Sequence, residues 1–379
     1  MTPKKLVMVG YTHDTNLGDQ VIADSAEYLI RKNALEEQLV VERFNLNYSN
    51  EFNSAKKIKR KSINKILSKL SPRSSFNYKI GCYKRDYKNK FDDAAAIVFA
   101  GGGMIKYKYQ DCWAHISALV DTVQVKPCPI FFNAVGVEGY DQADYKCRLL
   151  KASLNNPSVK MITTRDDLNV LNDGYIETDH IETAQVADSA VFSSEVYGVK
   201  KNSTDRVGVG LVRSKIFKDN GLDFNREQVI AFYASLLSEL ESRGQEYQLF
   251  TNGLKSDVDI LVDLENYMGK PLHIIEPQTP QELVELIATF KCTVAARLHA
   301  CIISYSLKVP VAGLVWNNKV KMFGDCIGYP DRFFTYEQFD AKSIVDRLMQ
   351  SVEEGYEPKR YEQYRQTVNA SINKMISMI

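Results

Sequence analysis

The residues best placed to do chemistry are an arginine and a histidine two positions apart, Arg297 and His299. An apolar run at 292–296 precedes them, a buried helix pattern at 298–307 follows, and residues 310–315 form a second apolar run. This order predicts both side chains at the carboxyl end of a parallel strand, where open sheets bind ligands and a helix N-terminus favours anions. The pair suits an anionic substrate that needs a proton moved, unless Arg297 only pairs with a carboxylate and His299 only caps the helix.

The composition is that of an ordinary globular protein large enough for two domains. The chain has 379 residues, of which 45% are apolar and 25% charged, and its net charge is +1. A near-neutral protein has, as a whole molecule, no strong attraction to nucleic acid or to a membrane. The sequence shows no run of about eighteen apolar residues and no secretory signal at its start. Its seven cysteines form no Cys-x-x-Cys pair, which favours reduced core thiols and a cytoplasmic location.

Two series of alternating strand and helix patterns must position these side chains. The first occupies residues 1–195 and the second residues 206–379, with a polar linker between them. Such alternation predicts an α/β fold of two Rossmann-like doubly wound domains with a central cleft, which is the plan of the GT-B class of glycosyltransferases. The last stretch, 361–379, has a weaker helical pattern and could pack back on the first domain.

Several predicted strands end in residues that suit ligand binding. Three glycines, Gly101, Gly102 and Gly103, follow a buried strand, so a ligand could approach the backbone closely and meet its N–H donors. Cations or an amide follow four other strands: Arg165, Arg213, Asn252 and Lys319. We expect all of these to face the cleft.

A polar loop at 11–19 joins the first strand to the first helix. It lacks the Gly-x-Gly-x-x-Gly spacing of dinucleotide sites. Its His13, Asp14 and Asp19 suit contact with a sugar hydroxyl, although the same residue types are typical of a turn and a helix N-cap.

Residues 55–90 stand apart by charge, with thirteen Lys or Arg against the single acid Asp86. Apolar residues within 58–70 approximate a helical stripe. A basic amphipathic helix on a near-neutral protein indicates a surface for anionic lipid head groups or pyrophosphate. The structural alternative is a solvated helix with an adjoining loop.

The motifs and their order resemble the polysaccharide pyruvyl transferases. The resemblance rests on Asn16-Leu17-Gly18-Asp19, Gly101-Gly102-Gly103, Thr164-Arg165-Asp166, Ala296-Arg297-Leu298-His299-Ala300, Val309-Pro310-Val311 and Lys319-Val320. Two positions depart from the family's usual pattern. Lys308 stands where a small residue or glycine is usual, and Trp316-Asn317-Asn318 where a Tyr-Asp-Pro-like run is usual. Both departures bear on the choice of acceptor more than on the reaction.

The resemblance implies a GT-B-like enzyme that transfers a pyruvyl group from phosphoenolpyruvate to two hydroxyls of a sugar, as a ketal. Phosphoenolpyruvate carries a phosphate and a carboxylate, so it needs several fixed cations. His299 is then expected to deliver a proton to the methylene carbon, with Arg297 as its catalytic partner. The predicted donor-binding residues are Arg165, Arg213, Asn252 and Lys319. The predicted acceptor-binding residues are Asn16, Asp19, Gly101, Gly102, Gly103 and His115, and the base for the sugar hydroxyls is left open among Asp19, His13 and His115.

No metal or other cofactor is expected, because Asp92-Asp93 precedes a strand and Asp166-Asp167 suits a helix start. The basic segment 55–90 would suit an acceptor carried on a polyprenyl diphosphate at the inner membrane face, as in bacterial capsule or exopolysaccharide assembly. Two rivals stay open. One is a GT-B glycosyltransferase that uses a nucleotide sugar, and the other is a non-catalytic carbohydrate-binding protein; donor preference and loss of turnover on substitution separate them.

Overall fold

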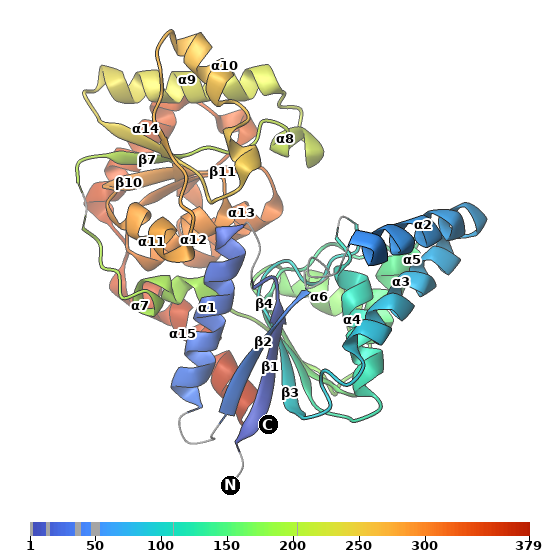
Figure 1. Ribbon diagram of the computed structural model, residues 1–379. Helices are drawn as coiled ribbons and strands as arrows, with labels where there is room; N and C mark the ends of the chain where they lie inside the picture. Colours follow the sequence, from blue (N-terminus) through green and yellow to red (C-terminus); the bar gives the residue numbers. More distant parts are fainter. Residues whose placement is uncertain (1–2, 13–15, 35–38, 47–53, 109, 203) are drawn as a thin grey trace. The chain divides into compact units, whose positions relative to one another are not determined.

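A computed structural model describes residues 3–12, 16–34, 39–46, 54–108, 110–202 and 204–379 (Figure 1). Two residues considered above, His13 and Asp14, lie outside this part of the chain. Contacts divide the chain into two compact units. The first unit comprises Met1–His13, Ile22–Ser189 and Thr367–Ile379, and the second comprises Asp14–Val21 and Ala190–Gln366.

The first unit is built on a six-stranded, wholly parallel sheet with strand order β2-β1-β3-β4-β5-β6. Its elements are β1 (Lys4–Gly10), α1 (Leu17–Asn33), β2 (Leu39–Asn45), α2 (Ser54–Leu70), α3 (Pro72–Tyr87), β3 (Ala94–Ala100), α4 (Cys112–Val123), β4 (Ile130–Val135), α5 (Tyr145–Leu154), β5 (Val159–Thr164), α6 (Leu168–Tyr175) and β6 (Glu182–Gln185). The first turn of α1 belongs by its contacts to the second unit.

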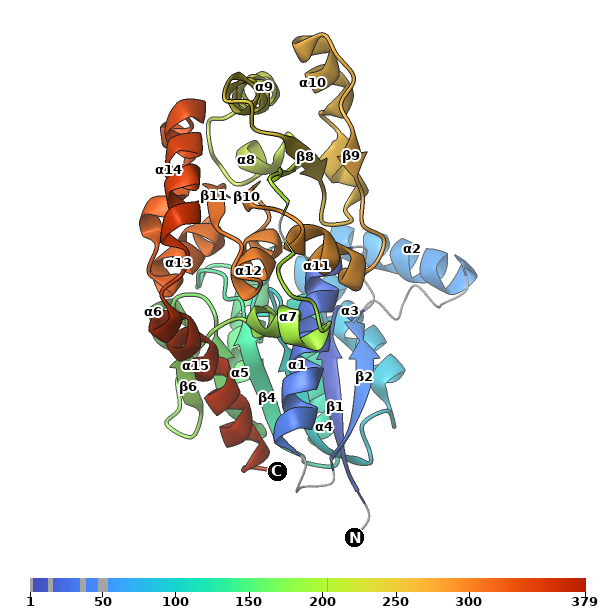
Figure 2. The same ribbon diagram turned by 90° about the vertical axis from the view of Figure 1, so that its left-hand side faces the viewer.

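Helices cover both faces of this sheet, as expected for parallel strands that are apolar along their length. α3, α4 and α5 lie on one face, and α1 with the end of α15 (Pro358–Ile376) lies on the other (Figures 1 and 2). The stacked rings of Phe99 and Phe132, with centroids 4.4 Å apart, belong to the buried cluster on the α4 side. On the opposite side, the amide of Asn33 in α1 donates to Asn369 in α15 over 3.0 Å.

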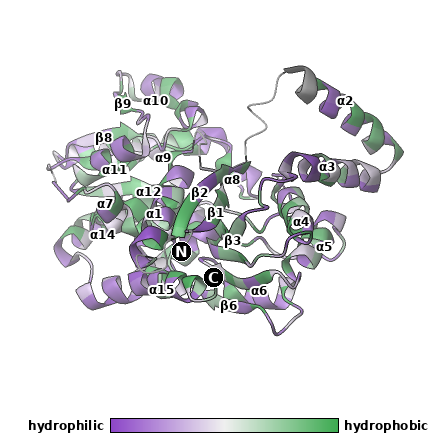
Figure 3. Ribbon diagram, turned by 60° about the horizontal axis from the view of Figure 1, so that its bottom comes forward, coloured by the Kyte–Doolittle hydropathy of each residue, from purple (hydrophilic) through white to green (hydrophobic). Residues whose placement is uncertain are grey.

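Helix α2 packs on α3 rather than on the sheet. Arg60 of α2 makes two bonds to Asp86 of α3, at 2.6 and 2.7 Å, and Ser75 of α3 donates to Asn64 of α2 over 2.7 Å. Hydrophobic and hydrophilic residues alternate along α2 (Figure 3). The basic segment is therefore helical over most of its length, and its first helix forms an outer layer on its second.

The second unit holds another six-stranded parallel sheet, with strand order β12-β11-β10-β7-β8-β9. Its elements are α7 (Ser193–Val196), β7 (Val207–Gly210), α8 (Ile216–Asp219), α9 (Arg226–Ser242), β8 (Tyr247–Phe250), α10 (Leu261–Met268), β9 (Ile274–Ile275), α11 (Pro280–Ala288), β10 (Cys292–Ala295), α12 (Leu298–Ser306), β11 (Val311–Val315), α13 (Asn318–Ile327), β12 (Phe333–Thr335) and α14 (Ala341–Glu354). α9 and α14 cover one face, and α11, α12 and α13 the other (Figures 1 and 2).

The strand order of each sheet reverses once, and the reversal fixes where a ligand can bind. In the first sheet the order turns between β1 and β3, and in the second between β7 and β10. Loops after the two strands at such a point leave in opposite directions, which opens a crevice at the carboxyl ends. The predicted α/β fold of two Rossmann-like doubly wound sheets is confirmed.

Local helix signals in the sequence are also confirmed. The run Thr279-Pro280-Gln281-Glu282 predicts a helix start. Thr279 does cap α11, its side chain accepting from the backbone N–H of Glu282 over 3.1 Å, with Pro280 in the first turn. Asp167 caps α6 and accepts from Asn169 over 2.8 Å. The apolar pattern of residues 257–268 predicts one helix. The structure instead has a 3₁₀ turn at Lys255–Val258, and α10 starts at Leu261.

Lys308 shows why a glycine would be usual at its position. It follows the end of α12 with φ of +56°, in the left-handed region that costs a residue with a Cβ about 1–2 kcal/mol. Its ammonium lies 4.7 Å from the ring centroid of Tyr361, a contact that offsets part of this cost. Backbone conformation at the helix end thus explains why a small residue or glycine is usual at this position.

We predict that Lys308→Gly is more stable than Lys308→Ala by about 1 kcal/mol, because both variants lose the contact with Tyr361 and only glycine relieves the backbone. Urea unfolding of the two variants measures the difference. Equal stabilities would show that the left-handed conformation carries no strain here.

Candidate active site

The second unit's crevice is organised by a buried ion pair between Arg297 and Asp257. Arg297 is the N-cap residue of α12, directly after β10, and Asp257 lies in the 3₁₀ turn that follows β8. Nε of Arg297 donates to Asp257 Oδ2 over 2.8 Å, and Nη2 donates to Oδ1. The carboxylate of Asp257 is fully buried, and the arginine side chain is 18% exposed. This bidentate pair holds the guanidinium at the end of the central strand.

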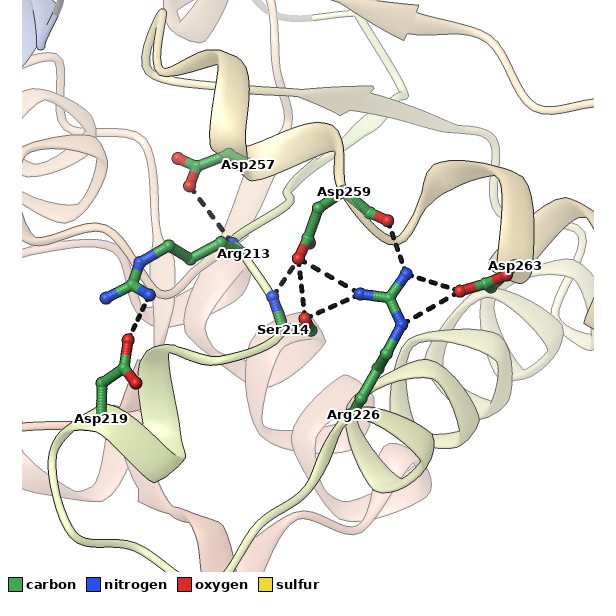
Figure 4. Close-up of polar contacts among 7 residues, drawn as sticks. All are labelled: Arg213, Ser214, Asp219, Arg226, Asp257, Asp259 and Asp263. Carbon is green, nitrogen blue, oxygen red and sulfur yellow. Dashed lines mark hydrogen bonds and ion pairs between the residues drawn. The ribbon is translucent and has the colours of Figure 1, made fainter.

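A second set of bonds fixes Asp257 in turn (Figure 4). The backbone N–H of Arg213, after β7, donates to Asp257 over 3.2 Å. The next residue, Ser214, donates from its backbone and its hydroxyl to Asp259, over 2.9 and 2.7 Å. Arg226 at the start of α9 bridges Asp259 and Asp263. The loops after β7 and β8 are therefore tied to one another, and both support the ion pair.

Two further predicted cations lie at the same edge of this sheet. The guanidinium of Arg213 is paired with Asp219 of α8, and both side chains are substantially exposed, at 32% and 48%. An exposed pair contributes little to stability, so an anionic ligand could replace the carboxylate at small cost. Lys319 lies in the first turn of α13, directly after β11, and is half-buried. Cationic residues thus follow three neighbouring strands.

Asn252, at the end of β8, supplies a buried donor. Its side chain is 2% exposed, and among the described residues Nδ2 has no hydrogen-bond partner. Its backbone oxygen accepts from the N–H of Leu17, the first residue of α1, over 3.2 Å. A buried donor without a partner costs roughly 1–3 kcal/mol. Such a cost is recovered if a ligand supplies the missing acceptor.

The segment around Asn16 and Asp19 belongs to this crevice, not to the sheet of the first unit. The side chain of Asn16 accepts from Gly18 N over 3.2 Å and donates to Asp19 over 2.9 Å, which closes the first turn of α1. Gly18 lies so close to His299 that a Cβ placed on it would come within 2.3 Å of Nδ1 and 2.6 Å of Cβ. The structure therefore brings Asn16 and Asp19 to the same place as His299.

His299 is the second residue of α12 and is only 7% exposed. One face of its side chain is closed by the backbone at Gly18. The strand end beneath it is held by Trp316, whose Nε1 donates to the oxygen of Ala296 over 2.7 Å. The imidazole is thus confined on a rigid support, as a residue that transfers a proton must be.

In the first unit, Gly101, Gly102 and Gly103 follow β3 at that sheet's own reversal point. Gly101 and Gly102 have φ of +60° and +69°, and a Cβ on Gly101 would lie 2.1 Å from the side chain of Ile22. Backbone conformation and packing explain these two glycines. Their loop is anchored to β4, because Gly101 donates to Asn133 over 2.8 Å and Gly136 donates to Gly102 over 2.6 Å. A role for the loop in binding the acceptor stays a prediction.

Arg165 lies in the first unit, after β5, and is 8% exposed. Its guanidinium is paired with Asp188, which is also buried. The neighbouring Asp166 accepts from the backbone N–H of Val137 over 2.9 Å and so joins the ends of β4 and β5. The part of Arg165 in donor binding stays a prediction.

His115 is packed inside the helical layer of the first unit. Its ring stacks on Tyr83 at 3.8 Å between centroids, and Nδ1 lies 2.5 Å from the hydroxyl of Tyr87. Burial lowers the pKa of His115 to about 4, so the ring is neutral at pH 7. These contacts account for the residue structurally, and its predicted role toward an acceptor has no support from them.

Sequence reasoning missed two residues on which the site depends. Asp257 falls in a stretch that reads as the start of a helix, and Gly18 reads as part of a turn. Asp257 could have been found because it is an acidic residue a few positions after a predicted strand, at the same sheet edge as Arg297, where it could pair with the arginine. The signal for Gly18 was a glycine inside the first turn of a helix, where it needs a packing reason.

Comparison with solved structures defines the class of fold. UDP-GlcNAc 2-epimerase of Methanocaldococcus jannaschii superposes with a TM-score of 0.61 at 10% identity, over 99% of this chain and 100% of that one. The Neisseria meningitidis UDP-GlcNAc 2-epimerase bound to UDP-GlcNAc gives 0.54 at 12%, over 99% and 98%. UGT71G1 of Medicago truncatula complexed with UDP-glucose gives 0.50 at 11%, over 99% and 98%. The fold is GT-B-like.

The sequence profile of the polysaccharide pyruvyl transferase family matches residues 16–318. The chain belongs to this family, and the resemblance drawn from its motifs is confirmed. The match begins at Asn16 and contains Arg297 and His299. No curated protein matches the chain significantly in sequence. No helix in the described part of the chain combines the length and apolarity needed to cross a membrane.

We predict that Gly18→Ala lowers the free energy of unfolding by about 1–3 kcal/mol, because the new methyl group overlaps His299. Denaturant unfolding measures the loss. Gly139→Ala is the matched control, because a Cβ there meets nothing within 4 Å.

A double-mutant cycle with His299→Ala identifies the cause. If the overlap with the imidazole is responsible, Gly18→Ala costs much less in the His299→Ala background. An equal cost in both backgrounds would contradict the contact between Gly18 and His299.

Proposed function

We propose that this chain transfers the pyruvyl group of phosphoenolpyruvate to two hydroxyls of a sugar, forming a pyruvate ketal and releasing phosphate. The observation that carries the proposal is the cluster at the reversal point of the second sheet. There, Arg297, Arg213 and Asn252 follow three neighbouring strands, and His299 is confined in the helix after Arg297. Among the described residues, the buried Nδ2 of Asn252 has no hydrogen-bond partner. The chain's membership of the polysaccharide pyruvyl transferase family supports the same reading.

The charges of phosphoenolpyruvate suit this cluster. Its carboxylate and phosphate each accept paired hydrogen bonds from a planar guanidinium. Arg297 uses Nε and Nη2 for Asp257, and among the described residues Nη1 has no partner. Asn252 Nδ2 is a second donor that has no hydrogen-bond partner among the described residues. Lys319 and the guanidinium of Arg213 would add positive charge around the phosphate.

The reaction requires one proton at carbon. As a sugar hydroxyl attacks the central carbon of the donor, His299 delivers a proton to the methylene carbon, which becomes the methyl group. The second hydroxyl then attacks the same carbon and phosphate leaves with its oxygen. One hydroxyl proton replaces the proton lost by His299 and the other leaves with the phosphate, so the balance closes without metal or redox chemistry. Asp19 follows Gly18, whose backbone lies against His299, and is the candidate base in the described part of the chain.

The acceptor is proposed to be a sugar unit of a polysaccharide precursor carried on a polyprenyl diphosphate, in capsule or exopolysaccharide assembly. A cytoplasmic protein working at the inner membrane face would meet such a precursor. The solved structures of similar fold are complexes or enzymes of UDP sugars, so a nucleotide-sugar donor is the competing outcome.

The test measures phosphate release from phosphoenolpyruvate in the presence of lipid-linked glycosides, with the ketal product identified by mass spectrometry. We predict that His299→Gln lowers turnover by roughly 10²–10⁴-fold while the affinity for phosphoenolpyruvate changes little, because a positioned general acid contributes that much. His180→Gln is the matched control, since His180 is an exposed histidine outside the site.

Two results would count against this account in different ways. Turnover of UDP sugars but not of phosphoenolpyruvate would replace the proposed donor. Near-normal turnover of correctly folded His299→Gln with phosphoenolpyruvate would keep the donor and remove His299 as the proton source.

A further inference from the structure

Helix α2 carries an apolar stripe that the fold leaves uncovered. Ile58, Ile66 and Leu70 are 64%, 61% and 76% exposed. Their spacing of eight and four residues keeps them on one side of a helix. Single exposed apolar residues are normal on soluble proteins, but three on one helix form a patch that indicates an interaction surface.

The orientation of this stripe is fixed by the opposite side of α2. Arg60 and Asn64 bind α3 through Asp86 and Ser75, so that side is committed to the fold. Ile63 lies between Arg60 and Asn64 in the sequence and has intermediate exposure, which agrees with packing toward α3. The exposed stripe therefore lies on the side of α2 away from α3.

Exposed lysines surround the stripe. Lys59, Lys61, Lys65 and Lys69 are all exposed, and α2 contains no acidic residue. Among the described residues, no acidic side chain pairs with these four lysines. Because the whole chain has a net charge of only +1, this positive charge is a local feature of α2.

The basic residues of α3 differ, because the fold uses them internally. Lys79 is paired with Asp111 over 2.8 Å and Lys84 with Asp121 over 3.2 Å. The guanidinium of Arg73 lies 4.9 Å from the ring centroid of Tyr145. The basic segment read from the sequence thus divides into a structural half on α3 and an outward half on α2.

We propose that α2 binds the surface of an anionic lipid bilayer, with Ile58, Ile66 and Leu70 inserted at the headgroup boundary and the lysines on lipid phosphates. The combination of exposed aliphatic side chains with lysines favours a lipid bilayer as the partner. A polyanion such as nucleic acid would use the lysines but gain nothing from three aliphatic side chains, whereas a bilayer uses both. The surface itself does not depend on the reaction; only its purpose, access to a lipid-linked acceptor, rests on the proposed function.

The test is flotation of the full chain with phosphatidylcholine vesicles that contain or lack phosphatidylglycerol. We expect binding only to the anionic vesicles, weakened by salt because exposed charges are screened. Lys65→Gln with Lys69→Gln should lower the partition coefficient about 25-fold, at roughly fivefold per lysine near the surface. Replacing Ile58, Ile66 and Leu70 by serine should lower it more than about tenfold, through lost apolar burial.

The matched control removes exposed apolar residues elsewhere. Val262 and Tyr267 on α10 are 66% and 65% exposed, and acidic residues accompany them on that helix. Replacing both by serine should leave vesicle binding unchanged. Circular dichroism confirms that every variant is folded, and phosphate release with a water-soluble acceptor glycoside should be unaffected in all of them, which separates this proposal from the proposed reaction.

Two outcomes would overturn the proposal. One is the absence of binding to anionic vesicles, or binding that neither set of α2 substitutions alters. The other is binding that depends on the lysines but not on the three apolar residues, which would make α2 a surface for a polyanion or an acidic protein.

Discussion

The candidate site depends on the burial of one carboxylate. Asp257 is fully buried, and a buried charge is tolerated only when it is paired and hydrogen-bonded. Arg297 supplies the pairing and the backbone of Arg213 supplies a further bond. Removing one member of such a pair typically costs about 3–5 kcal/mol. Burial of Asp257 requires the ion pair with Arg297. The same ion pair holds the guanidinium of Arg297, and with it the start of α12, at the reversal point of the second sheet.

The second constraint is steric. The backbone at Gly18 occupies the space where any larger residue would displace His299, and Leu17 N is bonded to the oxygen of Asn252. A segment from the start of the chain thus completes a site whose other residues come from positions more than 190 residues later. The loop after β1 therefore contributes to the second unit although its strand belongs to the first.

The sequence was sufficient for the fold because strand and helix patterns alternate and carry their own caps, as at Thr279 and Asp167. Residues at strand ends, such as Arg297 and Asn252, could be found because parallel strands all end at one edge. Two contacts could not be predicted from the sequence, because they depend on which loops meet in the folded chain. These are the pairing of Arg297 with Asp257 and the contact of Gly18 with His299. At Gly101 and Gly102 the sequence indicated a ligand-binding loop, but their positive φ angles already explain why glycine stands at both positions.

The measurement that tests the account most directly is calorimetric titration of phosphoenolpyruvate and of UDP-GlcNAc into the wild type and Asn252→Ala. The proposal that the second sheet's reversal point holds the donor predicts binding of phosphoenolpyruvate, weakened about tenfold or more in Asn252→Ala. The stability of the ligand-free variant should not fall, because among the described residues Asn252 Nδ2 has no hydrogen-bond partner to lose. Binding of UDP-GlcNAc in place of phosphoenolpyruvate, or equal affinity of both proteins for phosphoenolpyruvate, would contradict it.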